Sequence, residues 1–109
     1  MEECFALQVH PSDNVATVFA SPEKGSRVRV DDSTGTSHGM QVEDDIPYGH
    51  KIALKEIAQG ESIFKYGEVI GQATKLISPG QHVHVHNVVS LRGRGDLAPA
   101  ITEEDAHDI

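Results

Sequence analysis

Apolar residues along this chain come in short runs that are separated by polar turns. Phe5–Val9 and Val15–Phe19 are two such runs, and Pro11–Asn14 between them has the composition of a turn. Arg27–Val30 alternates charged and apolar residues, which is the period of a half-exposed strand. The polar segment Asp31–Gly39 predicts a loop or the tip of a hairpin. The pattern therefore predicts short strands joined by tight turns.

The same pattern continues along the rest of the chain. Further strands are predicted at Gln41–Glu43, Lys51–Leu54, Glu61–Tyr66, Val69–Ala73 and His82–Val89. No window sustains a period of 3.6 residues, so we expect only short helical turns, at Ser21–Lys24, Leu54–Ala58 and Thr74–Ser78. The prediction is an all-β fold with short strands and few helical turns.

A weak internal repeat lies in the middle of the chain. Residues 53–60 and 73–80 share the same spacing of Ala, Lys, Ile and Gly, and Pro22–Ser26 resembles a degenerate third copy. Each copy ends in a glycine just before a strand-like run, which indicates a turn that needs a positive φ. Repeated turn-plus-strand units favour several small sheets over a sandwich of long strands.

The length of 109 residues predicts a single domain with a modest core. We place this domain at residues 1–90. Residues 91–109 begin with Arg-Gly pairs and become acidic, so we expect a flexible tail. Two interpretations of the tail stay open: a frayed terminus, or a segment that orders on a partner.

Charge and cysteine content exclude several classes of function. The net charge of −8 argues against nucleic acid and against an anionic membrane surface. The single Cys4 cannot form a disulfide within the chain, which favours a reducing compartment. We find no signal-peptide pattern, no apolar run long enough to span a bilayer, and no phosphate-binding or nucleophile motif. A cytoplasmic protein is therefore expected.

The segment His82–Asn87 carries the sharpest chemical pattern, because histidine alternates with valine. On a regular strand, His82, His84 and His86 would share one face, with neighbours about 6–7 Å apart at Cα. Two imidazoles at that spacing can bind one metal ion, but all three would need a bend. Candidates for a further ligand are His50, Glu61 and Asp45. The alternative is a histidine face that contacts a partner or substrate.

Two shorter motifs contain lysine. His50 and Lys51 follow a Pro-Tyr turn, where a lysine can bind a carboxylate, although an ordinary polar turn explains them equally well. Lys65, Tyr66 and Gly67 end a predicted strand, where Lys65 can extend its ammonium to solvent and Tyr66 can pack on the glycine. Near the N-terminus, His10 and Asp13 are expected to pair and cap a local turn.

Three segments together resemble a known domain family. Residues 44–73 contain Gly-His-Lys and Lys-Tyr-Gly-Glu-Val-Ile-Gly, residues 80–88 contain His-Val-His-Val-His-Asn, and residues 9–16 form an opening strand and turn. These stretches resemble the SAF-type domain of altronate and galactarate dehydratases. The resemblance covers most of residues 5–89.

The resemblance implies a β-clip fold and a module that precedes, or sits as a small subunit beside, a larger catalytic chain. In this family the reaction is dehydration of a hexonic or aldaric acid to a 2-keto-3-deoxy acid, with Fe²⁺ or another divalent metal that we expect mainly in the partner chain. The small subunit of sulfolactate sulfo-lyase is similar. The positions that match the family are His50, Lys51, Lys65, Tyr66, Gly67, His84, His86 and Asn87.

Three functional hypotheses follow. The first is a small subunit or N-terminal module of a sugar-acid dehydratase, in which Lys51 or Lys65 binds the substrate carboxylate and the His82–His86 strand closes the site or faces the larger chain. The second is a non-catalytic module that binds a sugar acid or a protein. The third is a free-standing metal-binding protein that uses the three histidines. Association with further copies of the chain is left open.

Overall fold

The computed structural model describes residues 4–90, so the predicted tail lies outside the described residues. Within them the fold is all-β, as predicted, and no helix is long and apolar enough to cross a membrane. The strands are β1 (Phe5–Leu7), β2 (Val15–Val18), β3 (Arg27–Asp31), β4 (Ser37–Gln41), β5 (Lys51–Ala53), β6 (Ser62–Lys65), β7 (Glu68–Ala73), β8 (His82–Val83) and β9 (Val88–Ser90).

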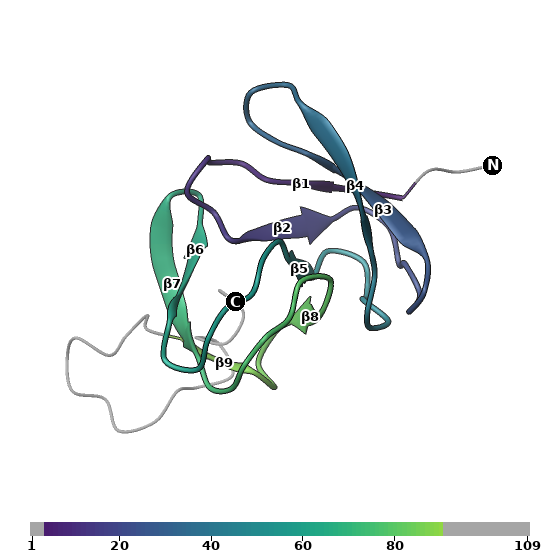
Figure 1. Cartoon of the computed structure of the whole chain (residues 1–109). Coiled ribbons are helices and arrows are strands. Elements are labelled where there is room, and N and C mark those ends of the chain that lie inside the picture. The colour runs from purple at the N-terminus through teal and green to yellow at the C-terminus, as the bar shows by residue number, and fades with distance from the viewer. Residues whose placement is uncertain (1–3, 91–109) are drawn as a thin grey trace.

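The strands form two sheets. The larger sheet has the order β4-β3-β1-β2-β5-β8, in which β1 pairs parallel with β3 and antiparallel with β2. The smaller sheet is β6-β7-β9. Figure 1 shows β6 and β7 on one side of the molecule and the β3–β4 hairpin on the other, with β5 and β8 between them. The short strands agree with the β-clip fold that the resemblance implied, whereas the six-stranded sheet is larger than the several small sheets that the repeat favoured.

Two hydrophobic clusters make up the core, and β5 contributes to both. Its Ile52 packs into the cluster of β1, β2 and β3, whereas Ala53 packs into the cluster that lies against the smaller sheet. Successive strand residues point to opposite faces, which explains this division. Because β5 has a core on each side, Lys51, Ile52 and Ala53 are all buried.

The internal repeat is a structural repeat. Ile57 and Ile77 occupy the same place in each copy and exchange two backbone hydrogen bonds, both of 2.8 Å. The amide of Gly60 donates to Ala73 O, and that of Gly80 donates to Ala53 O, so each copy binds the other in the same way. The helical turns expected at residues 54–58 and 74–78 are therefore wrong, because these backbones pair with each other instead.

The degenerate third copy uses the same backbone pattern. Gly25 N donates to Val42 O at 2.7 Å, and Ile46 N donates to Pro22 O at 3.0 Å. The glycines that end the three copies, Gly25, Gly60 and Gly80, have φ of 92°, 91° and 89°. The third expected helical turn, at residues 21–24, is wrong for the same reason: this segment forms the turn of a repeat.

Two predicted strands have other boundaries in the structure. The polar segment 31–39 is a hairpin whose tip is only residues 32–36, because Asp32 Oδ1 accepts the amides of Thr34 and Thr36. Its second strand, β4, replaces the strand predicted at 41–43. β4 is largely exposed on both faces, so it lacks the alternation that marks a half-buried strand.

The prediction of one strand from residue 82 to residue 89 is wrong. β8 ends at Val83, the chain turns, and β9 begins at Val88. The buried side chain of Asn87 causes this turn: its Oδ1 accepts the amide of His84 at 3.0 Å, and its Nδ2 donates to His82 O at 2.8 Å. The bend changes where the histidines lie.

Candidate functional site

Three histidines from two segments meet where the start of β5 lies beside the end of β8. β5 and β8 pair antiparallel with Ile52 opposite His82, which brings His50, just before β5, beside β8. His50 Nδ1 lies 2.9 Å from His82 Nε2, and the rings of His50 and His84 stack with centroids 4.1 Å apart. One ring nitrogen from each residue lies within 4.8 Å of the other two. We call His50, His82 and His84 the imidazole cluster.

The turn after β8 determines which histidines gather. Among the described residues, the cluster combines the predicted further ligand His50 with His82 and His84, and His86 lies outside it. His86 is exposed, with its ring centroid 4.9 Å from that of His82. The other two suggested ligands serve elsewhere: Glu61 accepts the amide of Ala58, and Asp45 accepts the amide of Lys24.

The environment disfavours the charged forms of His50 and His82. Burial, together with His86, His50 and His84 nearby, lowers the pKa of His82 to about 4, and Asp44 only partly opposes this. Burial and the charge of Lys51 also lower the pKa of His50 below its usual value. Neutral imidazoles offer lone pairs, so these shifts favour the protonation state of His50 and His82 that a metal requires.

The geometry of the cluster fits a divalent metal ion. Nitrogen ligands of a tetrahedral ion at about 2.0–2.1 Å lie roughly 3.3 Å from one another. The 2.9 Å distance between His50 and His82 and the 4.8 Å limit for the whole cluster bracket that value. Three imidazoles also leave room for a ligand from another molecule, as in catalytic metal sites.

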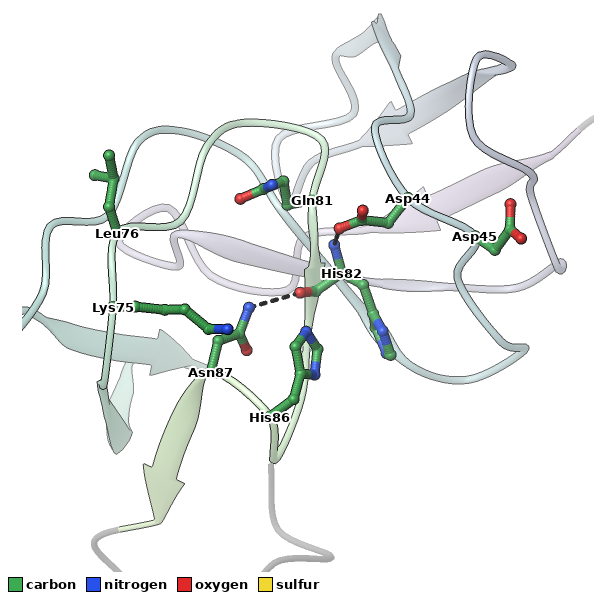
Figure 2. Close-up of a pocket in the computed structure, with 8 residues that line it drawn as sticks. All are labelled: Asp44, Asp45, Lys75, Leu76, Gln81, His82, His86 and Asn87. Atoms are coloured by element: carbon green, nitrogen blue, oxygen red, sulfur yellow. Dashed lines mark hydrogen bonds between the residues drawn. The ribbon is translucent and has the colours of Figure 1, made fainter.

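A pocket of about 500 Å³ opens beside His82. Figure 2 shows His82 and His86 entering it from one strand and turn, with Lys75 on one side and Asp44 on the other. Asp44 also accepts the amide of His82 at 2.9 Å, which anchors the start of β8. The pocket lining is Asp44, Asp45, Lys75, Leu76, Gln81, His82, His86 and Asn87.

Sequence reasoning missed Asp44, Lys75 and Gln81 as lining residues. Lys75 and Gln81 belong to the second repeat copy, which the pattern marked only as a turn. The repeat itself could be recognised in the sequence. Its residues line a pocket, however, only because the segment that contains Asp44 passes beside them. No local pattern in the sequence indicates that crossing.

A second group of side chains joins the two sheets. Lys51 on β5 is only 4% exposed, and Lys65 at the end of β6 lies within hydrogen-bonding reach of it. Burial and then the neighbouring charge of Lys65 lower the pKa of Lys51 to about 8. The Lys65 ammonium also lies 4.8 Å from the centroid of the exposed Tyr66 ring. We call Lys51 and Lys65 the lysine pair.

Asp13 fixes the turn that follows Lys65. Its Oδ2 accepts the amide of Tyr66 at 2.9 Å and its Oδ1 accepts that of Gly67 at 2.8 Å. Tyr66 has φ of 59°, a left-handed conformation that is unusual for a residue with a side chain. The expected local pair exists, since Asp13 Oδ2 also accepts the amide of His10. The larger role of the buried carboxylate is this long-range link.

Comparison with known proteins identifies the family. Residues 4–91 match the altronate/galactarate dehydratase SAF domain. The chain is 44% identical over 81 residues to altronate dehydratase of Bacillus subtilis, which is 74% of this chain and 15% of that protein. It is 38% identical over 60 residues to (2R)-sulfolactate sulfo-lyase subunit alpha of Paracoccus pantotrophus, which is 55% of this chain and 90% of that one.

A second alpha subunit, from Chromohalobacter salexigens, is 46% identical over 53 residues, 49% of this chain and 56% of that subunit. The alignment with the dehydratase thus spans about 15% of that enzyme's length, whereas the alignment with the Paracoccus subunit spans most of a small chain. The fold, the motifs and these matches agree. This chain belongs to the SAF domain family of altronate and galactarate dehydratases.

Proposed function

We propose that this chain is the SAF module or small subunit of a sugar-acid lyase and forms part of a substrate site that a larger catalytic chain completes. The dehydratase relatives support the hydroxy-acid chemistry, since this domain aligns with a segment of each enzyme. The sulfo-lyase relatives support the separate subunit, since their small chains are named as subunits alpha.

The imidazole cluster is the observation that carries the proposal. In this proposal His50, His82 and His84 hold a divalent metal, Fe²⁺ or another ion, at the boundary with the larger chain, which supplies further ligands. When bound, such an ion polarises the oxygen atoms of a hydroxy acid, which makes the α-proton more acidic and helps a β-hydroxyl to leave.

The residues of this chain would position the substrate and the cluster. Asp44 and Asn87 hold the backbone on either side of the histidines, at His82 and His84, so the rings keep their orientation. The adjoining pocket of about 500 Å³ has room for a six-carbon acid. Within the described residues, no other group of three histidine, cysteine or acidic ligands meets the same spacing. The base that removes the α-proton is assigned to the larger chain.

The test is reconstitution of activity. We expect the purified chain alone to convert neither altronate nor galactarate, and the mixture with a larger dehydratase-type chain from the same source to release a 2-keto acid. His84→Gln should reduce this turnover strongly, because it removes a cluster ligand. His38→Gln is the matched control, because His38 lies on the exposed strand β4. Turnover by the chain alone, or equal activity of both variants, would contradict the proposal.

The imidazole cluster also favours the simpler alternative of a metal-binding protein without catalysis. Metal analysis of the purified chain separates the two functions when it is combined with the activity assay. Bound metal that His84→Gln abolishes, without any turnover in the mixture, would support this alternative. Metal together with reconstituted turnover would support the lyase.

A further inference from the structure

Lys51 differs from the other described lysines because it is buried. Its residue is 4% exposed, whereas Lys24, Lys55 and Lys75 are exposed and Lys65 is partly exposed. Burying an ammonium group is costly unless an opposite charge compensates for it. A buried lysine that the fold retains on a central strand therefore needs an explanation.

The strand register places Lys51 on the opposite face from the imidazole cluster. In the larger sheet Lys51 lies between Thr17 and Val83, whereas the next pair is Ile52 with His82. Side chains alternate along a strand, so Lys51 shares its face with Val83 and points toward the smaller sheet. Lys65 reaches it from the end of β6 in that sheet.

No acidic side chain in the described part of the chain neutralises the lysine pair. Among residues 4–90, no carboxylate forms an ion pair with Lys51 or Lys65. Asp13 contacts the turn after Lys65, but its oxygens accept the backbone amides of residues 10, 66 and 67. Ten of the chain's 17 acidic residues lie within residues 4–90, and none of these ten forms an ion pair with the lysine pair.

We infer that Lys51 and Lys65 form a carboxylate-binding subsite, distinct from the imidazole cluster, for the carboxylate of a sugar diacid that lies remote from its reacting carbons; this inference rests on the proposed function. One carboxylate can accept a hydrogen bond from each ammonium group through its two oxygens. It would supply a counter-charge that Lys51 does not receive from any carboxylate within residues 4–90. The exposed Tyr66 ring beside Lys65 marks the side from which the acid enters.

The test measures binding of galactarate to the metal-free chain by NMR, through the Hε–Cε signals of the lysines. We expect the signals of Lys51 and Lys65 to shift together with one saturable curve. Lys51→Met and Lys65→Met should each weaken the affinity about tenfold or more, because each removes one charge-assisted hydrogen bond. Lys65→Met keeps the test valid if the change at the buried residue prevents folding.

Two variants serve as controls, Lys24→Met and Lys55→Met. Both change an exposed lysine that belongs neither to the lysine pair nor to the pocket lining, so both variants should bind galactarate like the parent chain. The inference is overturned if saturating galactarate leaves the signals of the lysine pair unchanged, if Lys65→Met binds normally, or if Lys75→Met alone weakens binding. Sulfate that binds as tightly as galactarate would overturn the assignment to carboxylates.

Binding and turnover fail independently. If galactarate binds at the lysine pair but reconstitution yields no keto acid, the subsite stands and the lyase proposal fails. If reconstituted turnover tolerates Lys65→Met with an unchanged KM, the lyase proposal stands and the subsite fails.

Discussion

The two close copies of the repeat share the same backbone turn but are followed by side chains of different chemical types. We call residues 60–67 the first branch and residues 80–87 the second branch. Each begins with a glycine of positive φ, and three residues later each has a fully buried aliphatic side chain, Ile63 or Val83. The neighbouring positions differ. The first branch has Ser62, Phe64, Lys65 and Tyr66 where the second has His82, His84, Val85 and His86.

The comparison shows which positions build the fold and which carry the chemistry. The shared glycine and aliphatic residue define the turn and the core, and the positions that alternate with them can vary. As a result the first branch contributes Lys65 to the lysine pair, and the second contributes His82 and His84 to the imidazole cluster. A repeated structural unit thus places a lysine and a set of imidazoles on the two faces of β5.

The largest expected effect tests whether the copies share one core. Ile57 and Ile77 are 1% and 0% exposed and pair with each other, so Ile57→Ala and Ile77→Ala should each lower the free energy of unfolding by about 2–5 kcal/mol. Denaturant unfolding measures both losses. Because the two residues are in contact, the loss of unfolding free energy in the double variant should differ from the sum of the two single losses. Additive losses would mean that the copies are energetically separate.

The turns of the repeat were predictable from the sequence because the residues that recur in each copy are the ones that the turn requires. The spacing of Ala, Ile and Gly indicated the turns, and the alternation of apolar residues indicated most strands. The pairing of one copy with the other was not predictable from either segment alone, since each by itself also suits a helical turn. Only the contact between Ile57 and Ile77 decides for the extended form.

The candidate site was predictable in its residue types and not in its grouping. Strand alternation placed His82, His84 and His86 together, but the side chain of Asn87 ends the strand and turns the chain. His50 joins the cluster through the pairing of β5 with β8, which is a long-range property. For the same reason the sequence named Lys51 and Lys65 separately and did not place them side by side.

A second pair of variants tests whether the two turn glycines have equivalent surroundings. Gly60→Ala should cost about 1–2 kcal/mol, because φ is +91° but a Cβ would meet open space. Gly80→Ala should cost about 3 kcal/mol or more, because its Cβ would also meet the carbonyl oxygen of Gln41. Thermal and denaturant unfolding give both values. Equal losses would show that the segment around Gln41 moves away freely.

The third comparison concerns how each branch ends. The first ends in a turn held by the remote Asp13, and the second in a turn held by its own Asn87. Asn87→Ala should lower the free energy of unfolding by about 1–3 kcal/mol, since it removes the hydrogen bonds to the amide of His84 and to the carbonyl of His82. Asp13→Ala should lie at the upper end of that range, because a charged group there accepts three amides.

The two variants should also differ in where the structure loosens. Asp13→Ala should increase amide exchange at Tyr66 and Gly67, and Asn87→Ala should increase it at His84. Hydrogen exchange detected by NMR measures this directly. Increased exchange in both turns for either variant would mean that the branches open as one unit.

The last comparison separates the imidazole cluster from the lysine pair by pH. The pKa of His82 falls from 6.5 to about 4 on folding, and the pKa of Lys51 from 10.5 to about 8. In each window the unfolded chain binds more protons than the folded one, so stability rises with pH. The contribution of His82 is present above pH 6.5 and is lost as the pH falls toward 4; that of Lys51 is present above 10.5 and is lost toward 8.

Unfolding measured across pH in the presence of a chelator, without added acid ligands, tests both windows. His82→Gln should flatten the pH dependence of stability between pH 4 and 6.5 and leave the alkaline window unchanged. The charged and titratable groups that face His82 remain in this variant: His50, His84, His86 and Asp44. Lys51→Met should flatten the window between 8 and 10.5, where Lys65 is the neighbouring charge, and should also raise the pKa of His50, which the charge of Lys51 helps to lower. If His82→Gln altered the alkaline window, His82 and the lysine pair would be one coupled electrostatic site, and the independence of the two windows would be wrong.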